Sequence, residues 1–336
     1  MAVSDGDEAL SETTTIEWCD RTWSPWEGCT KVSPGCDHCY AERMNRWLKA
    51  GENWGPGAPR RIFGDEHWQK PVRWYAEAAR KGVRFKVFPS VCDPFDNEVA
   101  PIIRARLFDL IERTPNLDWL LLTKRIGNAK AMIDEAVDDV RGAVAGVPAW
   151  PWPNVWLGAT IVNQEEADRD IPKLLAVPAR VRFLSCEPLL GEIDITPFLW
   201  GKHERVDRIC QNCPRDADCE CGYHTRTDMK LPALHWVIVG GESGPKARPT
   251  HPDWARGLRD QCAAAGVPFM FKQWGEWRPT GEWEPFPGDK VMQTAQVFID
   301  TDRSGRQRHG PSVIRVGKKA AGRLLDGVQH DGFPTC

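Results

Sequence analysis

The chain has 336 residues, of which 41% are hydrophobic and 27% charged, and its formal net charge is −3. This is ordinary globular composition in a chain long enough to bury a substantial core, and the net charge gives no overall attraction to nucleic acid. No apolar run approaches the roughly 20 residues of a membrane span, and the acidic, polar N-terminus lacks the basic and then apolar order of a signal peptide. We therefore expect a cytoplasmic protein with no membrane partner.

Strand and helix patterns alternate through most of the chain. Short runs rich in β-branched and aromatic residues predict six strands, and stretches with helical spacing predict helices between most of them. In chain order we expect the helices Tyr40–Ala50 and Trp68–Lys81, the strand Arg84–Val91, the helix Glu98–Arg113, the strand Asp118–Lys124, the helix Asn128–Val140, the strand Val155–Ile161, the helix Glu165–Val177, the strands Arg180–Glu187 and His235–Glu242, the helix Pro252–Ala265 and the strand Pro268–Trp274.

This alternation predicts an α/β fold with a parallel sheet and helices outside it. The sheet is either a partial or complete parallel (β/α) barrel of the TIM-barrel kind or a doubly wound sheet, and we favour the barrel. We expect a disordered tail over 1–14, the first part of the barrel over 15–202, an insertion over 203–230, the last part of the barrel over 231–280 and a C-terminal extension over 281–336. The seventeen tryptophans fit core packing better than base stacking.

Three cysteines near the N-terminus have the spacing C-x6-C-x2-C and predict a metal site: Cys29, Cys36 and Cys39. Three thiolates satisfy three irons of a [4Fe–4S] cube and leave the fourth iron open for a small molecule. A closed zinc site requires a fourth ligand, and His38 or Cys19 would be the candidates for it. We favour the cube because the loop opens a barrel and not a zinc finger.

The expected insertion carries a second group of metal-ligand residues in a polar, charged segment, with the spacing C-x2-C-x5-C-x-C-x2-H: Cys210, Cys213, Cys219, Cys221 and His224. A segment of about 30 residues with almost no apolar core requires an internal metal to fold. Zinc and an auxiliary iron–sulfur cluster both suit these ligands, and we favour zinc. We expect this metal-binding insertion to lie beside the mouth of the barrel.

Polar side chains follow the expected strands where each one ends: Cys92 and Asp93, Lys124, Thr160 and Asn163, Cys186 and Glu187, and Gly240, Gly241 and Glu242. Loops at the carboxyl ends of parallel strands meet at one face, where α/β proteins carry their active sites. We therefore expect six of the residues to ring one cavity of a few hundred cubic ångström: Cys29, Asp93, Lys124, Thr160, Glu187 and Glu242.

These motifs resemble the radical S-adenosylmethionine superfamily. A three-cysteine loop ending Cys-x-x-Cys-Tyr, a strand ending Asp-Pro-Phe, then Leu-Leu-Thr-Lys and a later Glu-Pro are similar to its branch near spore photoproduct lyase. A phage-associated three-cysteine-motif family of uncertain activity is more similar still, from about residue 15 to 334, through Trp-Ser-Pro-Trp-Glu-Gly-Cys, Leu-Ser-Cys-Glu-Pro-Leu-Leu-Gly and Val-Gly-Gly-Glu-Ser-Gly. Two features depart from the superfamily's pattern. Its usual spacing is C-x3-C-x2-C, whereas three more residues separate Cys29 from Cys36 here. Its Gly-Gly-Glu element follows an early strand, whereas Gly240-Gly241-Glu242 follows a late one.

The resemblance implies a radical enzyme that reductively cleaves S-adenosylmethionine at a [4Fe–4S] cluster. It implies cofactor contacts from Asp93, from Lys124 or Arg125 to the methionine carboxylate, and from Thr160 and Asn163 to the ribose. It further implies contacts from Gly240, Gly241 and Glu242 to the ammonium group, although a strand-to-helix turn uses the same glycines. It also implies catalytic roles for Glu187 and for Cys92 and Cys186, which would donate a hydrogen atom to a product radical.

The expected substrate is a nucleic acid or nucleotide in a phage-related context, with an electron-donor protein and a separately encoded protein as partners. The alternative is a non-catalytic, metal-stabilised protein that binds nucleic acid or another partner.

Overall fold

Seven parallel strands form the central sheet of the computed structural model, which describes residues 14, 16–48, 51–200, 204–205, 228–229, 233–280, 296–301 and 307–334. Their order is β1 (Arg21–Thr22), β4 (Phe85–Phe88), β5 (Leu117–Thr123), β6 (Val155–Thr160), β7 (Val181–Cys186), β10 (Trp236–Gly240) and β11 (Phe269–Gln273). The sheet curls into a half-barrel, and its edge strands β1 and β11 do not pair with each other. The fold is therefore α/β, compatible with a partial barrel and not with a closed one.

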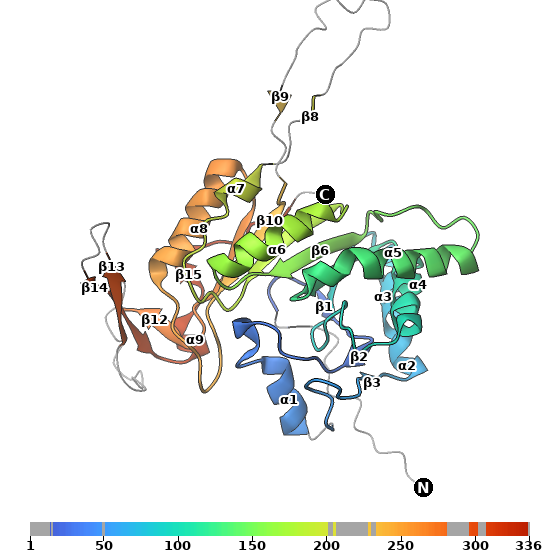
Figure 1. Ribbon diagram of the computed structural model, residues 1–336, viewed down its shortest axis with the longest axis horizontal. Helices are drawn as coiled ribbons and strands as arrows, with labels where there is room; N and C mark the ends of the chain where they lie inside the picture. Colours follow the sequence, from blue (N-terminus) through green and yellow to red (C-terminus); the bar gives the residue numbers. More distant parts are fainter. Residues whose placement is uncertain are drawn as a thin grey trace, which may run out of the picture.

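Helices cover the outer face of the sheet (Figure 1). They are α3 (Lys70–Lys81), α4 (Pro101–Glu112), α5 (Ile126–Ala143), α6 (Gln164–Ala176), α7 (Thr196–Leu199) and α8 (Pro252–Ala265), while α1 (Tyr40–Leu48) and α2 (Asp65–Trp68) lie before them in the chain. All six predicted strands and all six predicted helices are confirmed to within a few residues. None of the helices that the structure describes combines the length and apolarity that a membrane crossing requires.

The half-barrel is filled on both faces by apolar side chains. On β7, Val181 and Phe183 belong to the cluster inside the curl, whereas Leu184 and Cys186 belong to the larger cluster under the outer helices. This alternation follows from the period of two along a strand. The core-packing interpretation of the tryptophans is confirmed for eleven that are buried: Trp18, Trp23, Trp26, Trp68, Trp74, Trp119, Trp152, Trp156, Trp236, Trp274 and Trp277.

Gly158 on β6 lies opposite Phe183 and leaves room for its ring. A Cβ atom at Gly158 would lie 2.3 Å from the ring. We therefore expect Gly158→Ala to overpack the inner cluster and to lower the free energy of unfolding by about 1–3 kcal/mol. Urea denaturation checks this, with Gly142→Ala as the control, because that exposed helical glycine has no neighbour within 4 Å. Equal stability of Gly158→Ala and the wild type would contradict the packing.

The C-terminal part of the chain adds an antiparallel sheet in the order β12 (Trp277–Pro279), β14 (Gln307–Arg315) and β13 (Gln296–Thr301). After α9 (Lys318–Ala321), the paired strands β15 (Leu324–Leu325) and β16 (Val328–Gln329) follow. The next residues lie along the edge of the main sheet: Gly332 N donates to Phe269 O at 2.9 Å, and the Phe333 ring lies 4.7 Å from that of Trp236. The described end of the expected extension is thus packed on the half-barrel.

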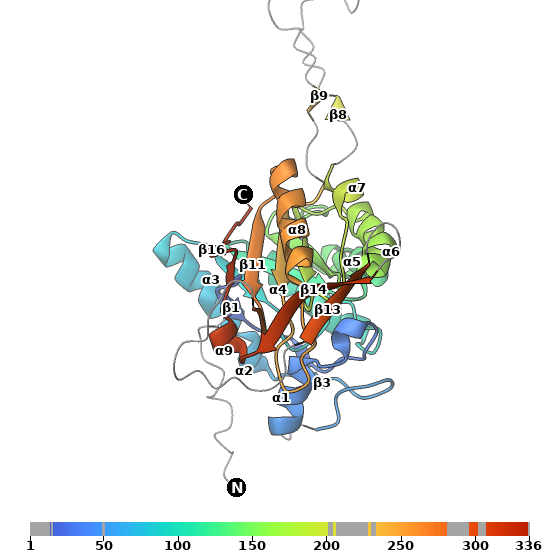
Figure 2. The same ribbon diagram turned by 90° about the vertical axis from the view of Figure 1, so that its left-hand side faces the viewer.

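The predicted insertion falls almost entirely outside the described residues, and so do its four cysteines. Its described ends form the antiparallel pair β8 (Glu204–Arg205) and β9 (Asp228–Met229), between α7 and the start of β10. Figures 1 and 2 both place this pair at the opposite end of the molecule from α1. The prediction that the insertion lies beside the mouth is wrong for these ends, because the chain enters β10 at its amino end and the mouth is at the carboxyl ends.

Candidate functional site

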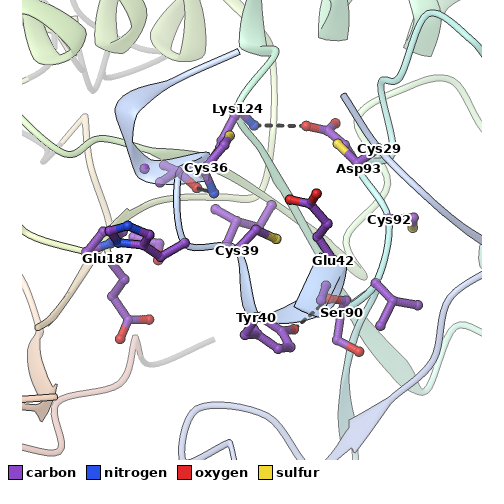
Figure 3. A pocket seen from close by; sticks show the side chains of 18 of the residues that line it. Cys29, Cys36, Cys39, Tyr40, Glu42, Ser90, Cys92, Asp93, Lys124 and Glu187 are labelled. Carbon is purple, nitrogen blue, oxygen red and sulfur yellow. Dashed lines mark hydrogen bonds between the residues drawn. The ribbon is translucent and has the colours of Figure 1, made fainter. Parts of the chain in front are cut away.

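A cavity of about 240 Å³ lies at the carboxyl ends of the sheet strands. The three clustered cysteines line it, together with residues that follow or end β4, β5, β6, β7 and β10: Asp93, Lys124, Thr160, Glu187 and Glu242. Figure 3 shows the three thiols around this space with Asp93, Lys124 and Glu187. The predicted convergence on one cavity is confirmed, because parallel strands place their carboxyl ends together.

The cysteine loop is held from both ends. Gly28, at φ +121°, forms a bridge to Cys92, and a Cβ atom on it would lie 2.2 Å from Asn53 O. Just upstream, β2 (Trp26–Glu27) pairs with β3 (Arg61–Ile62). The 3₁₀ turn η1 (Pro34–Cys36) is capped by Ser33, which accepts from Gly35 N at 3.0 Å. α1 begins directly after Cys39, so a short and well-anchored loop presents the three thiols.

The two candidate fourth ligands of a zinc site, His38 and Cys19, have other neighbours in the structure. Among the described residues, no group of three or more His, Cys, Asp or Glu side chains is drawn together tightly enough to hold one metal ion. His38 Nδ1 lies 3.0 Å from Glu242 Oε2, and Cys19 is buried in the inner cluster and does not line the cavity. In a cube each thiolate binds a different iron, so the three sulfurs need not meet at one point.

The surroundings of Cys29 favour its protonated thiol. Burial and the Asp93 carboxylate raise the pKa of its thiol to about 11, although the nearby Arg125 guanidinium opposes them. A metal ligand must be a thiolate, and binding of a cluster here would therefore release this proton.

Asp93 is fully engaged by its neighbours. Its Oδ1 accepts from Thr123 Oγ1 at 2.6 Å and from Phe95 N at 3.0 Å, and its Oδ2 accepts from Lys124 N and Arg125 Nη1, both at 3.1 Å. With 5% of its surface exposed, it anchors the loops after β4 and β5 to each other. Such a carboxylate is placed to orient other cavity residues.

Three lysines line the cavity, and Lys31 Nζ lies 3.2 Å from Glu42 Oε2. Lys124 Nζ lies 3.4 Å from Thr160 Oγ1, and no carboxylate of the described residues forms an ion pair with it. Lys272 Nζ lies 3.2 Å from Glu187 Oε2. Of these three lysines in the described part of the chain, Lys124 is therefore the one available to an anionic ligand, since Lys31 is paired with Glu42 and Lys272 with Glu187.

Glu242 joins the cysteine loop to the loop after β10. Its carboxylate accepts from Arg248 Nη2 at 2.6 Å, and Arg248 also donates to Asp37 Oδ2 at 3.0 Å and Pro34 O at 2.9 Å. Burial raises the pKa of Glu242, but the hydrogen bonds from Arg248 and His38 outweigh burial and hold this pKa below its ordinary value. We call Glu242, Arg248, His38 and Asp37 the clasp.

We expect Arg248→Gln to loosen the loop that carries Cys36, because the clasp then loses its central cation. Hydrogen exchange at neutral pH should show faster exchange over residues 33–39, while Arg106→Gln, at a surface pair with Asp65, should leave it unchanged.

The clasp also predicts that hydrogen exchange over the cysteine loop of the wild type becomes faster in acid. A carboxylate whose pKa is lower in the folded state stabilises the fold above its unfolded pKa of about 4.3, and this stabilisation is lost as the pH falls through the folded value. Exchange over 33–39, corrected for intrinsic rates, should rise in that window in the wild type. A step of the same size in Arg248→Gln would contradict the clasp.

Three predicted site residues do not line the cavity. Cys186 is fully buried under the outer helices, because Ser185 and Glu187 on either side of it take the inward positions. Asn163 caps α6 and accepts from Glu166 N at 2.9 Å. Gly240 packs against Glu187, whose Oε1 would lie 2.2 Å from a Cβ atom at that position. The predicted roles of Cys186 and Asn163 at the mouth are therefore wrong, and Gly240 serves packing.

Cys92 and Gly241 do line the cavity, as predicted. A Cβ atom on Gly241 would lie 2.0 Å from Trp274 O, so this glycine is required by the neighbouring chain whatever the ligand. No local pattern in the sequence indicates Arg248 as a site residue, because its contact with Pro34 joins segments 214 residues apart.

One family model matches residues 13–334, and its description is Protein of unknown function (DUF5131). No curated protein and no solved structure matches the chain.

Proposed function

We propose that this chain, which belongs to the DUF5131 family of proteins of unknown function, is a radical S-adenosylmethionine enzyme with a [4Fe–4S] cluster on Cys29, Cys36 and Cys39. One observation carries the proposal: three thiols on a single loop line the same cavity as the polar carboxyl ends of a parallel half-barrel. The fourth iron of such a cluster has no protein ligand and is open to a small molecule.

When bound and reduced by one electron, such a cluster supplies the electron that breaks a carbon–sulfur bond of S-adenosylmethionine. The chain's own residues would bind S-adenosylmethionine and orient it. Lys124 offers its ammonium to the methionine carboxylate, and Thr160, 4% exposed beside it, offers a hydroxyl. Arg248 and His38 already contact the Glu242 carboxylate, and Arg248 neutralises its charge. Gly241 and Glu242 therefore shape one side of the cavity. The apolar inner cluster below excludes water from the floor of the cavity.

For the substrate we propose a nucleic acid or nucleotide in a phage-related context, and for the location the cytoplasm. The support is the resemblance to the branch near spore photoproduct lyase, which is analogy at the level of the family. An electron-donor protein, a separately encoded partner and a second metal on Cys210, Cys213, Cys219 and Cys221, which lie outside the described residues, complete the proposal.

The activity is tested by anaerobic reconstitution with iron and sulfide, reduction with dithionite and addition of S-adenosylmethionine. We expect 5′-deoxyadenosine and methionine in equal amounts, and we expect Lys124→Met to weaken binding of S-adenosylmethionine while it keeps the iron. Reconstituted wild type that holds iron but never cleaves S-adenosylmethionine would favour the alternative, a metal-stabilised binding protein.

A further inference from the structure

Arg125 reaches one of the three clustered sulfurs directly. Its Nη1 lies 3.2 Å from Cys29 Sγ, within the distance of a hydrogen bond to sulfur. The residue follows β5 and precedes the first turn of α5, and only 7% of its side chain is exposed. A guanidinium at this depth is screened little by water, so its charge acts strongly on the sulfur.

The guanidinium is fixed in this position by two further partners. Its Nη1 also lies 3.1 Å from Asp93 Oδ2, and its Nη2 donates to Thr30 O at 2.6 Å. Burial alone would lower the pKa of Arg125, but the neighbouring Asp93 carboxylate opposes burial, and the pKa of the guanidinium is raised. Arg125 therefore stays charged, and its donors are committed to the cysteine loop and to Asp93.

We propose that Arg125 is a positioning residue that raises the reduction potential of the cluster bound by Cys29. This inference rests on the proposed function. A charge-assisted hydrogen bond withdraws electron density from a ligating sulfur, and a nearby positive charge stabilises the reduced cluster, which carries one more electron. Asp93 acts through Arg125, because its Oδ2 holds the guanidinium against the loop. The pair thus tunes how readily the cluster accepts its electron from the donor.

The test measures the midpoint potential of the reconstituted cluster by titration followed by electron paramagnetic resonance. We expect Arg125→Gln to shift the potential to a more negative value than in the wild type. Arg125→Lys should give an intermediate shift, because it keeps the charge and loses the second arm of the guanidinium. Arg46→Gln is the matched control: it removes the same charge from α1, where Arg46 is 75% exposed and paired with Glu42.

The second readout is the iron–sulfur(cysteine) stretching frequency in resonance Raman spectra. Loss of the hydrogen bond should strengthen the bond from iron to Cys29 and raise this frequency in Arg125→Gln and Arg125→Lys but not in Arg46→Gln. Equal potentials and frequencies in the Arg125 variants and the wild type, at equal iron content, would overturn the inference and leave the proposed function standing.

Loss of the cluster from both Arg125 variants, with the fold retained, would also overturn it, because Arg125 would then be needed to hold the cluster and not to tune it. If only Arg125→Gln loses iron, the potential of Arg125→Lys decides: a more negative value supports the inference, and the wild-type value overturns it. A wild type that forms no cluster would instead defeat the proposed function itself.

Discussion

Replacing Cys36 with Ala should remove nearly all iron from the reconstituted protein, from about four atoms at this site to almost none. Cys36 is 8% exposed in the middle of the loop, and a cube left with two thiolates loses its anchor on that side. Cleavage of S-adenosylmethionine should disappear with the iron. Chemical analysis of iron and sulfide, read beside circular dichroism, separates loss of the cluster from loss of the fold.

The control for this change is Cys262→Ala. Cys262 is a fully buried thiol on α8, packed under the sheet and away from the cavity. Its replacement removes a sulfur without touching the site, so iron content should match the wild type even if stability falls. Retention of a full cluster by Cys36→Ala would show that the three cysteines are not its ligands.

Asp96→Ala should destabilise the whole protein by about 3–5 kcal/mol, since it leaves the Arg60 guanidinium buried without its carboxylate. Arg60 Nε lies 2.7 Å from Asp96 Oδ2, and each side chain is 1% exposed. Arg60 also donates to Ala58 O and to Thr30 Oγ1, both at 2.8 Å, so the pair holds the segment beside the cysteine loop. Iron binding should weaken along with stability.

Urea denaturation measures the first effect, and the iron content of folded protein measures the second. Asp134→Ala is the matched control, because Asp134 pairs with Lys130 on the exposed face of α5, where both side chains are more than half exposed. An exposed pair of this kind contributes about 0–1 kcal/mol. If Asp96→Ala and Asp134→Ala cost the same, the buried pair does not organise the site.

The strands and helices could be predicted because their residues are patterned locally. The run around Leu120 and Leu121 on β5 is buried on both faces and reads as a strand, and the apolar spacing around Ile133 and Val137 on α5 reads as a helix. The short β1 was missed because two residues show no period. The position of β1 depends on a contact with the neighbouring strand β4: the Asp20 Oδ2 atom accepts a hydrogen bond from Lys86 N at 2.7 Å.

The convergence of the strand ends could be predicted as well, because a parallel sheet places them together. The face on which each side chain lies could not, since it depends on where each strand begins, and one residue of register exchanges the two faces. The prediction for Cys186 failed for this reason, while its neighbours Ser185 and Glu187 reach the cavity. The contacts of Arg125 with Cys29 and of Arg248 with Pro34 join distant segments, and no local pattern encodes them.

The most direct test of the cluster and its open iron is the electron paramagnetic resonance spectrum of the reduced, anaerobically reconstituted wild type, recorded with and without S-adenosylmethionine. We predict the signal of a reduced [4Fe–4S] cluster that changes in shape when S-adenosylmethionine is added, because the ligand would bind the iron that no cysteine holds. A spectrum that does not change on addition, or a colourless protein that binds only zinc after careful reconstitution, would contradict the account.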